Sequence, residues 1–360
     1  MTSDRTPLES QLARRIELEG PVTFRDFMQA ALYDREHGYY NTERLKIGPQ
    51  GDFYTSSNVH SAFGAVLARA FRQLHPEEPL TLVEMGAGTG QLASDILASL
   101  EAASLESVRY VIVETSPAMR RRQRERLGRF SGRVEWREPF ALMKEDEALT
   151  GIVFSNELVD AFPVHRVRAV GGRLEEMYLT ATSGKLEAFW GLPSTARLQD
   201  YLDRCGVKIA ENQAAEINLD AVEWLETVSR MLKRGYLVTI DYGDLAPHLY
   251  AGDRREGTLR AFSRHTVTDA IFERVGEQDL TASVNFTALI EYGKDFGFEP
   301  VSYERQTSFL LRSGLIEIIA GMETASGGTV DDLKERLAIK NLFVPGGVSD
   351  NFRVLVQRKG

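Results

Sequence analysis

The sequence has a single cysteine, Cys205, among its 360 residues. One thiol excludes an internal disulfide framework and fits a reducing compartment. The chain also lacks any apolar run as long as a membrane span. Its N-terminus has no apolar core of a secretory signal, and its acids disfavour a transit peptide: Asp4, Glu9, Glu17 and Glu19. We therefore expect a cytoplasmic protein with no membrane association.

The chain has no surplus of basic residues. Its formal net charge is −9, which argues against a general nucleic-acid binder but does not exclude a basic substrate. The six histidines show no metal-ligand spacing, so we expect no metal site. Neither a G-x-S-x-G elbow nor a Walker lysine is present, which disfavours hydrolases and NTPases. We interpret the basic run at 120–126 as the solvated face of a helix; an RNA or acidic-partner patch is the alternative.

The most informative stretch that is present is LTLVEMGAGTGQ at 80–91. A short apolar run ends in Glu84 and opens into three glycines at alternate positions, and helical spacing follows. A strand, a glycine turn and a helix form the phosphate- or nucleoside-binding unit of an open α/β sheet, because glycine lets a ligand approach the backbone closely. A turn without a ligand, which only closes the corner between strand and helix, is the alternative.

The residues of this turn indicate which ligand it binds. A dinucleotide fingerprint requires a third Gly or Ala where this chain has Gln91. The pattern E-x-G-x-G-x-G is instead the form used by S-adenosylmethionine-dependent methyltransferases. A nicotinamide-dependent dehydrogenase is therefore disfavoured.

Strands and helices alternate through most of the chain, which is long enough for one large domain with insertions or for two domains. We expect a Rossmann-like, doubly wound α/β sheet of seven strands, mostly parallel, that ends in an antiparallel pair. The expected strands are 80–85, 109–114, 133–136, 150–155, 236–241, 299–304 and 352–358.

Two parts of the chain lie outside this alternation. We expect residues 1–76 to form an N-terminal helical cap with a lid loop, and residues 77–360 to form the sheet domain. An inserted β element is expected at about 165–225, and a second insertion with little regular structure at about 243–290. Insertions at the carboxyl edge of a sheet commonly build substrate sites.

Acidic and amide side chains end the strands of the expected sheet. Glu114 should lie on the strand beside the glycine turn, where it can accept both ribose hydroxyls of a nucleoside, or it simply faces solvent. Asn156, Glu157 and Asp160 follow the fourth strand. They could hold a substrate nitrogen or deprotonate a guanidinium, whereas a helix-capping role is the alternative for Asn156 and Asp160.

Two loops supply further candidates. The segment 37–57 mixes aromatic, glycine and hydroxyl residues with Asp52, and it is either a lid over the cofactor or packing for the N-terminal helices. The second insertion contributes four more polar residues: Arg260, His265, Thr281 and Asn285.

Eight motifs spread over nearly the whole length resemble the MidA family, relatives of the mitochondrial complex I assembly methyltransferase. They are HGYY at 37–40, GDFYTS at 51–56, LVEMGAGTG at 82–90, SNELVDAFPVH at 155–165, DYG at 241–243, LRAF at 259–262, DLTASVNF at 279–286 and FRVL at 352–355. The second and fourth of these are far more specific than the glycine turn.

The resemblance implies a class I methyltransferase fold, S-adenosylmethionine as cofactor and, by analogy with the mitochondrial relatives, methylation of a protein arginine. It also implies roles for residues. The cofactor would contact Glu84, Gly86, Ala87, Gly88, Gly90, Glu114 and Thr55, and the reaction cleft would contain Gly51, Asp52, Asn156, Glu157 and Asp160.

The chain departs from the family pattern at several positions. Ala87 and Thr89 stand in the glycine turn where the family usually has Pro and Arg. Asn58 and Asn285 stand where the family usually has acids. Fewer acids would hold a guanidinium less strongly, so the alternative function is a non-catalytic assembly factor that binds a partner protein. We expect a protein substrate and allow for a homodimer.

Overall fold

A mixed sheet forms the centre of the computed structural model. The structure describes residues 5–42, 61–105, 107–138, 149–263, 266–268, 270–325 and 351–360. Within these ranges the sheet has eight strands in the order β15-β16-β10-β5-β2-β3-β4, with β14 beside the end of β10. Their bounds are β2 (Leu80–Met85), β3 (Val108–Val113), β4 (Val134–Arg137), β5 (Leu149–Asn156), β10 (Leu232–Asp244), β14 (Val284–Asn285), β15 (Phe298–Arg305) and β16 (Phe352–Lys359).

The strand directions confirm the fold class expected from the sequence. Strands β10, β5, β2, β3 and β4 are parallel, whereas β16 is antiparallel to both β10 and β15. All seven expected strands are present. The order reverses between β2 and β5, and in open α/β sheets a ligand crevice forms at the carboxyl ends of the strands at such a reversal.

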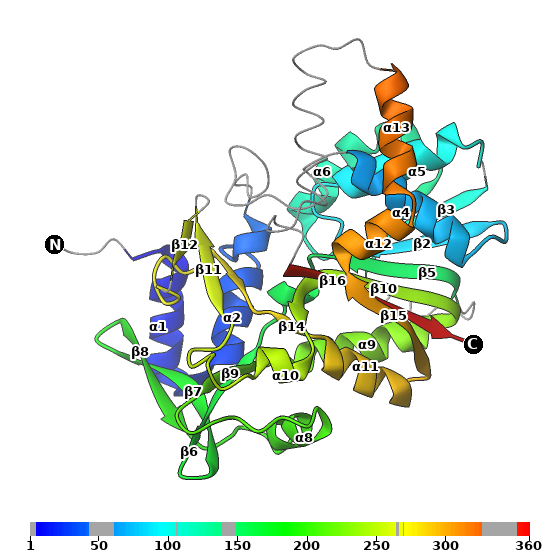
Figure 1. Cartoon of the computed structure of the whole chain (residues 1–360). Coiled ribbons are helices and arrows are strands. Elements are labelled where there is room, and N and C mark those ends of the chain that lie inside the picture. Colours follow the sequence, from blue (N-terminus) through cyan, green and yellow to red (C-terminus); the bar gives the residue numbers. More distant parts are fainter. Residues whose placement is uncertain are drawn as a thin grey trace.

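Helices cover both faces of this sheet, which explains why β2 is buried along its whole length (Figure 1). Helices α4 (Ser61–Leu74), α5 (Gln91–Ala102), α12 (Gln306–Arg312) and α13 (Leu315–Ala325) lie on one side, and the other side carries α9 (Leu219–Met231) and α11 (Phe286–Asp295). Alternate residues of β2 serve the two cores: Leu82 packs on the first side and Val83 on the second. Helix α6 (Pro117–Arg126) follows β3.

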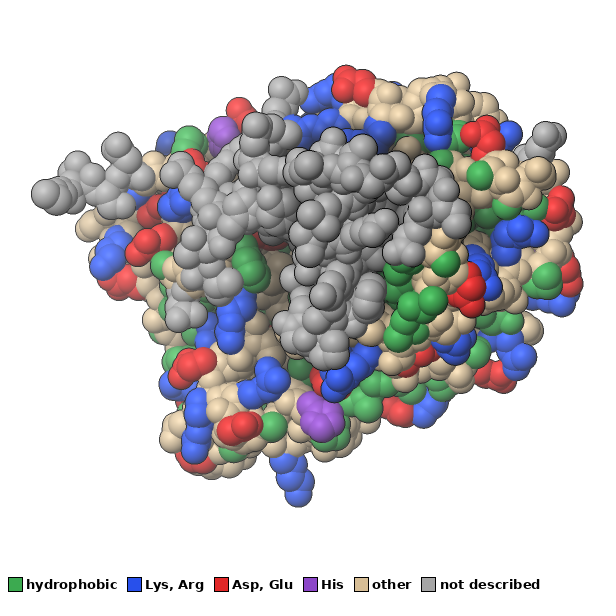
Figure 2. All heavy atoms as spheres, turned by 45° about the horizontal axis from the view of Figure 1, so that its top comes forward, with side chains coloured by type: hydrophobic (Ala, Val, Ile, Leu, Met, Phe, Trp, Pro, Cys, Tyr) green, Lys and Arg blue, Asp and Glu red, His purple; other side chains and the backbone are tan. Residues whose placement is uncertain are grey.

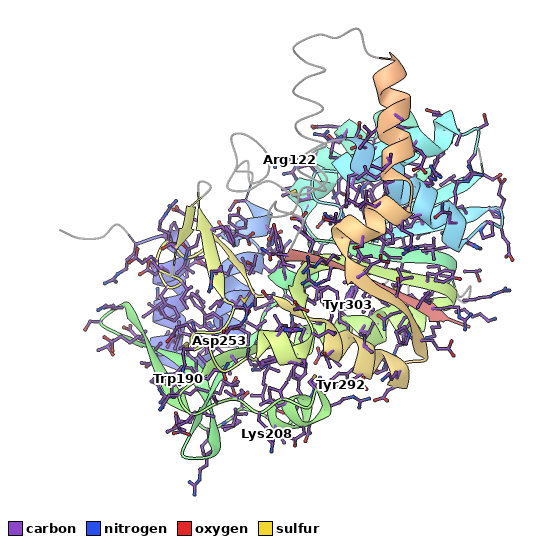
Figure 3. All side chains as sticks on the ribbon, viewed as in Figure 1. Arg122, Trp190, Lys208, Asp253, Tyr292 and Tyr303 are labelled. Atoms are coloured by element: carbon purple, nitrogen blue, oxygen red, sulfur yellow. The ribbon has the colours of Figure 1, made fainter. Side chains whose placement is uncertain are left out.

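A second lobe joins the N-terminal helices to the inserted strands. Its helices are α1 (Pro7–Glu19) and α2 (Phe24–Tyr33), and its strands are β1 (Val22–Thr23), β6 (His165–Val170), β7 (Arg173–Thr182), β8 (Lys185–Gly191) and β9 (Ala214–Ile217). The strands form a sheet in the order β1-β7-β6-β9, with β8 beside β7. Phe24 and Phe27 of α2 share a core with Leu179 of β7. Figure 3 places Trp190, on β8, in this lobe, and Tyr303, on β15, in the sheet lobe.

Individual residues determine where the first N-terminal helix ends and where the second begins. Gly20 ends α1 with a φ of 98°, and the Thr23 hydroxyl accepts the backbone N–H of Asp26 to begin α2. These two residues therefore separate α1 from α2.

The segment 243–290 is more regular than we expected. Strands β11 (Arg260–Ser263), β12 (Thr266–Thr268) and β13 (Asp279–Thr281) form a small sheet in the order β12-β11-β13. The expectation of little structure here is wrong because strands of three or four residues are too short to show an alternating pattern. Leu259 and Leu280 pack this small sheet against the hydrophobic core of the second lobe. The short helices α8 (Arg197–Arg204) and α10 (Ala246–Leu249) complete the described insertions.

The surface carries charges of both signs. On the face shown in Figure 2, acidic and basic side chains are both spread over the described residues. Across the part of the chain that the structure describes, no helix combines the length and the apolar character needed to cross a bilayer.

Candidate active site

A cavity of about 990 Å³ lies between the sheet and the second lobe. Its walls come from the ends of β2, β3 and β5, from α2, and from strands β11 and β13 of the small sheet. Such a volume lies at the upper end of the usual range for small-molecule sites, so it has room for a nucleoside cofactor and a side chain. The cavity therefore opens at the reversal point of the sheet, where the topology places a ligand.

The glycine turn, residues 86–90, forms the floor at the end of β2. Its glycines have φ values of 74°, 50° and 79°, a region that other residues rarely adopt: Gly86, Gly88 and Gly90. A Cβ on Gly86 would lie 2.7 Å from the Leu158 side chain, so glycine also lets the end of β5 approach closely. Gly86, Ala87 and Gly88 line the cavity, whereas Gly90 begins α5.

Glu84, one residue before the end of β2, has its carboxylate deep inside the protein. It is 2% exposed, lines the cavity, and accepts a hydrogen bond of 2.7 Å from the Tyr110 hydroxyl. Burial raises the pKa of Glu84 to about 7; the Tyr110 hydrogen bond opposes this shift and the charge of Glu114 adds to it. Glu84 therefore titrates near neutral pH.

Glu114 lies at the end of β3, on the strand directly beside the glycine turn, as we expected. Its two carboxylate oxygens accept the Ser116 backbone N–H at 2.8 Å and the Gln123 amide at 3.0 Å. Burial raises the pKa of Glu114, while these two hydrogen bonds oppose the shift. The Thr115 backbone N–H also lowers the pKa of this carboxylate, and a carboxylate with about four lone pairs still keeps one for a ligand hydroxyl. The alternative, a glutamate that simply faces solvent, does not hold, since the residue is only 9% exposed.

The acid turn, residues 156–160, forms the next wall after β5. Asn156, Glu157 and Asp160 all line the cavity, so the structure brings these three predicted residues together. Glu157 has a φ of 54°, an uncommon conformation for a residue with a side chain. The Asn156 amide donates to Glu157 at 3.1 Å, whereas its buried Oδ1 has no partner among the described residues. An acceptor oxygen at this position is therefore available to a ligand donor.

Asp160 lies in a strongly acidic environment. It is 7% exposed, and burial raises its pKa well above the usual range; the charges of Asp241, Asp279 and Glu157 add to this shift. Asp241, on β10, does not line the cavity. Its Oδ2 accepts the backbone N–H groups of Leu158 at 3.1 Å and Val159 at 2.8 Å. The helix-capping role that we considered for Asp160 belongs instead to Asp241.

The second lobe closes the cavity with aromatic and acidic side chains. Tyr33 and Tyr40 stack with their ring centroids 5.5 Å apart, and both line the cavity. The Tyr40 hydroxyl donates to Asp279 at 2.9 Å, and the Tyr40 carbonyl accepts the Ser116 hydroxyl at 3.0 Å. Residues 37–42 therefore contact both lobes.

Some candidate residues from the second insertion line the cavity, and others do not. Arg260 and Thr281 line the cavity. Asn285 does not: it begins α11 by accepting the backbone N–H of Ala288, and its amide donates to the Tyr201 hydroxyl at 3.1 Å. The idea that Asn285 removes an acid from the cleft is therefore wrong.

Some predicted residues lie outside the described residues. These are Gly51, Asp52, Thr55, Asn58 and His265.

Sequence reasoning missed several residues that shape the site. The principal ones are Tyr33, Tyr40, Gln123, Asp241 and Asp279. Three of them, Tyr40, Asp241 and Asp279, belong to the motifs HGYY, DYG and DLTASVNF, but the sequence predicted no role for these individual residues. Within the described residues there is no group of three or more His, Cys, Asp or Glu side chains placed to hold a metal ion.

The residues present fit S-adenosylmethionine. The glycine turn offers backbone without side chains, and Glu114 offers acceptor oxygens for ribose hydroxyls at the neighbouring strand end. The buried Glu84 carboxylate, on β2 just before the glycine turn, can stabilise the cationic end of the cofactor. The acid turn and the stacked tyrosines line this same cavity, so a methyl acceptor that enters it would lie close to both.

Comparisons with known proteins point to the same chemistry. The model of the Methyltransf_28 family, described as S-adenosyl-L-methionine-dependent methyltransferases, matches residues 62–303. A crystal structure of a COG1565 superfamily member from Burkholderia thailandensis, bound to S-adenosyl-homocysteine, superposes with a TM-score of 0.88. The two chains are 30% identical, and the match covers 98% of this chain and 92% of that one.

The curated relatives carry more specific names. The mitochondrial protein arginine methyltransferase NDUFAF7 homolog of Drosophila melanogaster is 26% identical over 306 residues, which cover 78% of this chain and 68% of that protein. The human protein arginine methyltransferase NDUFAF7, also named as mitochondrial, is 26% identical over 344 residues, covering 86% and 74%. These similarities confirm the resemblance inferred from the sequence motifs.

Proposed function

This chain belongs to the Methyltransf_28 family of S-adenosylmethionine-dependent methyltransferases, and we propose that its methyl acceptor is an arginine side chain of a protein. The observation that carries the proposal is the acidic and aromatic set of side chains that line the same cavity as the glycine turn: Glu157, Asp160 and Asp279, with Tyr33 and Tyr40. Carboxylates bind the planar guanidinium through charge-assisted hydrogen bonds, and aromatic faces stack on it. The names of the curated relatives support the same acceptor.

The reaction requires a base because the guanidinium is protonated at neutral pH. When bound, S-adenosylmethionine would supply an electrophilic sulfonium methyl group in exchange for S-adenosylhomocysteine, and the acceptor nitrogen that takes this methyl would have to release a proton. Asp160 is the group we assign to accept that proton. Its raised pKa makes its ionised form a strong base, and an arriving guanidinium favours that ionised form.

Other residues of the wall position the acceptor. The unpartnered Oδ1 of Asn156 can accept an N–H of the guanidinium. Asp279 is held by the Tyr40 hydroxyl, so its orientation is fixed before the acceptor arrives. Because this orientation is fixed beforehand, less entropy is lost when the reactants reach the transition state. Such alignment is the main contribution an enzyme makes to a displacement at carbon.

The test uses S-adenosylmethionine with an isotopically labelled methyl group and proteins of a cell extract as acceptors. Mass spectrometry should find labelled methyl groups on arginine nitrogens. Asp160→Asn should lower the rate of transfer by about 10²-fold, which is the contribution typical of a general base, and should leave S-adenosylhomocysteine binding in place. Asp203→Asn, an exposed position on α8, is the matched control and should change neither quantity. Label on another residue type, or a fully active Asp160→Asn protein, would overturn the proposal.

A protein substrate is the macromolecular partner that this proposal requires. The cytoplasmic location and the homodimer considered from the sequence stay predictions, as does the absence of nucleic-acid and membrane partners. Light scattering coupled to size-exclusion chromatography measures the oligomeric state directly.

A further inference from the structure

The arginine-rich helix α6 contains one side chain that is completely buried. Gln123 is 0% exposed although it stands in the run RRRQRER, which the sequence indicated to be a solvated face. Its neighbour Arg122, labelled in Figure 3, marks the position of α6 in the sheet lobe. A buried amide must be hydrogen-bonded to be tolerated, so the partners of Gln123 explain its position.

Gln123 connects the two halves of the cofactor site. Its Nε2 donates to the carbonyl oxygen of Gly88 at 2.8 Å and to Oε2 of Glu114 at 3.0 Å. The backbone and side chain of Gln123 also pack against the turn, since a Cβ on Gly90 would lie 3.4 Å from them. One side chain therefore fixes both the glycine turn and the ribose-binding carboxylate, although it does not line the cavity itself.

Trp136, on β4, fixes the orientation of this amide. Its Nε1 donates to Oε1 of Gln123 at 3.0 Å. The indole N–H can only donate, so the amide oxygen must face Trp136 and the NH₂ group must face the two acceptors. A rotated amide would place its oxygen against the Gly88 carbonyl and the Glu114 carboxylate, which repel it. We propose that Gln123, oriented by Trp136, is a positioning residue that prearranges Glu114 and the glycine turn for S-adenosylmethionine.

The environment of Glu114 gives this role a distinctive readout. The Gln123 hydrogen bond lowers the pKa of Glu114, so its loss should raise that pKa further. The other charged groups near this carboxylate are Glu84 on β2 and Arg120 on α6, whose charge lowers the pKa. Tyr33, from α2, is the neighbouring phenol, and burial keeps its pKa well above 10. Protonation of Glu114 removes an acceptor for the ribose, so ligand binding should weaken at acid pH.

The experiment is calorimetry of the full-length protein with S-adenosylhomocysteine from about pH 5.5 to about pH 8.5. This range stays above the pH at which protonation of native carboxylates causes acid unfolding. Gln123→Met keeps the shape and removes the amide. It should weaken binding by about 10- to 100-fold, as expected for hydrogen bonds to a charged group and to a buried carbonyl. It should also move the acid limb of the binding profile to higher pH. Gln199→Met, at an exposed position on α8, is the matched control and should leave binding unchanged.

Trp136→Phe tests the orientation separately and guards against a Gln123 variant that does not fold. It should weaken binding by a smaller factor of roughly 3- to 10-fold, because the amide loses one partner but keeps its place. In the Gln123→Met background the same change should add nothing. A purely structural role would lower the melting temperature of both variants while leaving the dissociation constant and the pH profile of the folded protein unchanged. That result would overturn the proposal, and it is independent of which residue accepts the methyl group.

Discussion

Replacement of Asp241 by alanine should separate the catalytic step from cofactor binding. The carboxylate of Asp241 is fully buried and accepts two well-formed backbone N–H groups of the acid turn, from Leu158 and Val159. Its other oxygen accepts the backbone N–H of Tyr242 at 2.9 Å. No atom of Asp241 lines the cavity, so its removal affects the reaction only through the position of the acid turn.

The size of the effect follows from the groups left behind. Each buried N–H that loses its partner costs about 1–3 kcal/mol. Relief of the repulsion between Asp241 and Asp160 offsets part of this loss. We expect Asp241→Ala to lower the free energy of unfolding by about 2–4 kcal/mol at pH 7. In the protein that remains folded, kcat should fall far more than the affinity for S-adenosylhomocysteine, because the glycine turn and Glu114 are untouched.

The dependence on pH supplies a second measurement on the same residue. Burial raises the pKa of Asp241 from 3.8 to about 7, so between these values the folded protein holds a proton that the unfolded chain does not. The free energy of unfolding should therefore decrease as the pH rises from about 4 to about 7. Asp241→Asn, which cannot ionise, should show a shallower decrease in urea titrations. An equal slope in the two proteins, or a loss of cofactor affinity as large as the loss of kcat, would refute this account of Asp241.

Three further changes test other parts of the site. Gly88→Val should abolish measurable binding of S-adenosylhomocysteine in calorimetry, because the branched side chain would fill the turn. At a φ of 50° it would also strain the backbone by about 1–2 kcal/mol. The control is Gly171→Val, at a φ of 56° in an open hairpin, which should carry the same strain and leave binding intact. Glu114→Gln should weaken binding of that ligand by about 10- to 100-fold, since a charged acceptor for the ribose is lost, and an unchanged dissociation constant would place the ribose elsewhere. Tyr40→Phe should raise KM for the protein substrate through the lost hydrogen bond to Asp279, with a change of about 1 kcal/mol, and a steady-state assay that finds KM unaltered would remove Asp279 from acceptor binding.

The sequence was sufficient for the centre of the sheet because β2, β3 and β5 are largely buried apolar runs separated by helical patterns. The strand at 80–85 and its parallel neighbour at 109–114 required only their own residues to be recognised, and their adjacency followed from the rules of α/β topology. The cavity residues Glu84, Glu114 and Asp160 were found in the same way, as polar residues at strand ends.

Contacts between distant segments could not be read from local patterns. Tyr40 meets Asp279 across 239 positions, and Asp241 meets Leu158 across 83. The burial of Gln123 could not be predicted because its neighbours in sequence are charged, mostly arginines. A single buried position on a charged helix produces no apolar stripe. Asn285 was placed near the reaction by its motif, whereas in the structure it begins a helix.

A crystal structure of the protein with S-adenosylhomocysteine would show directly whether the cofactor lies between Glu114 and the acid turn. We expect the ribose hydroxyls to lie within hydrogen-bond distance of the Glu114 carboxylate, the amino-acid end to lie beside the glycine turn, and the sulfur to face the acid turn that holds Asp160. A ligand that lies away from Glu114, with its sulfur turned from Asp160, would refute this arrangement of the site.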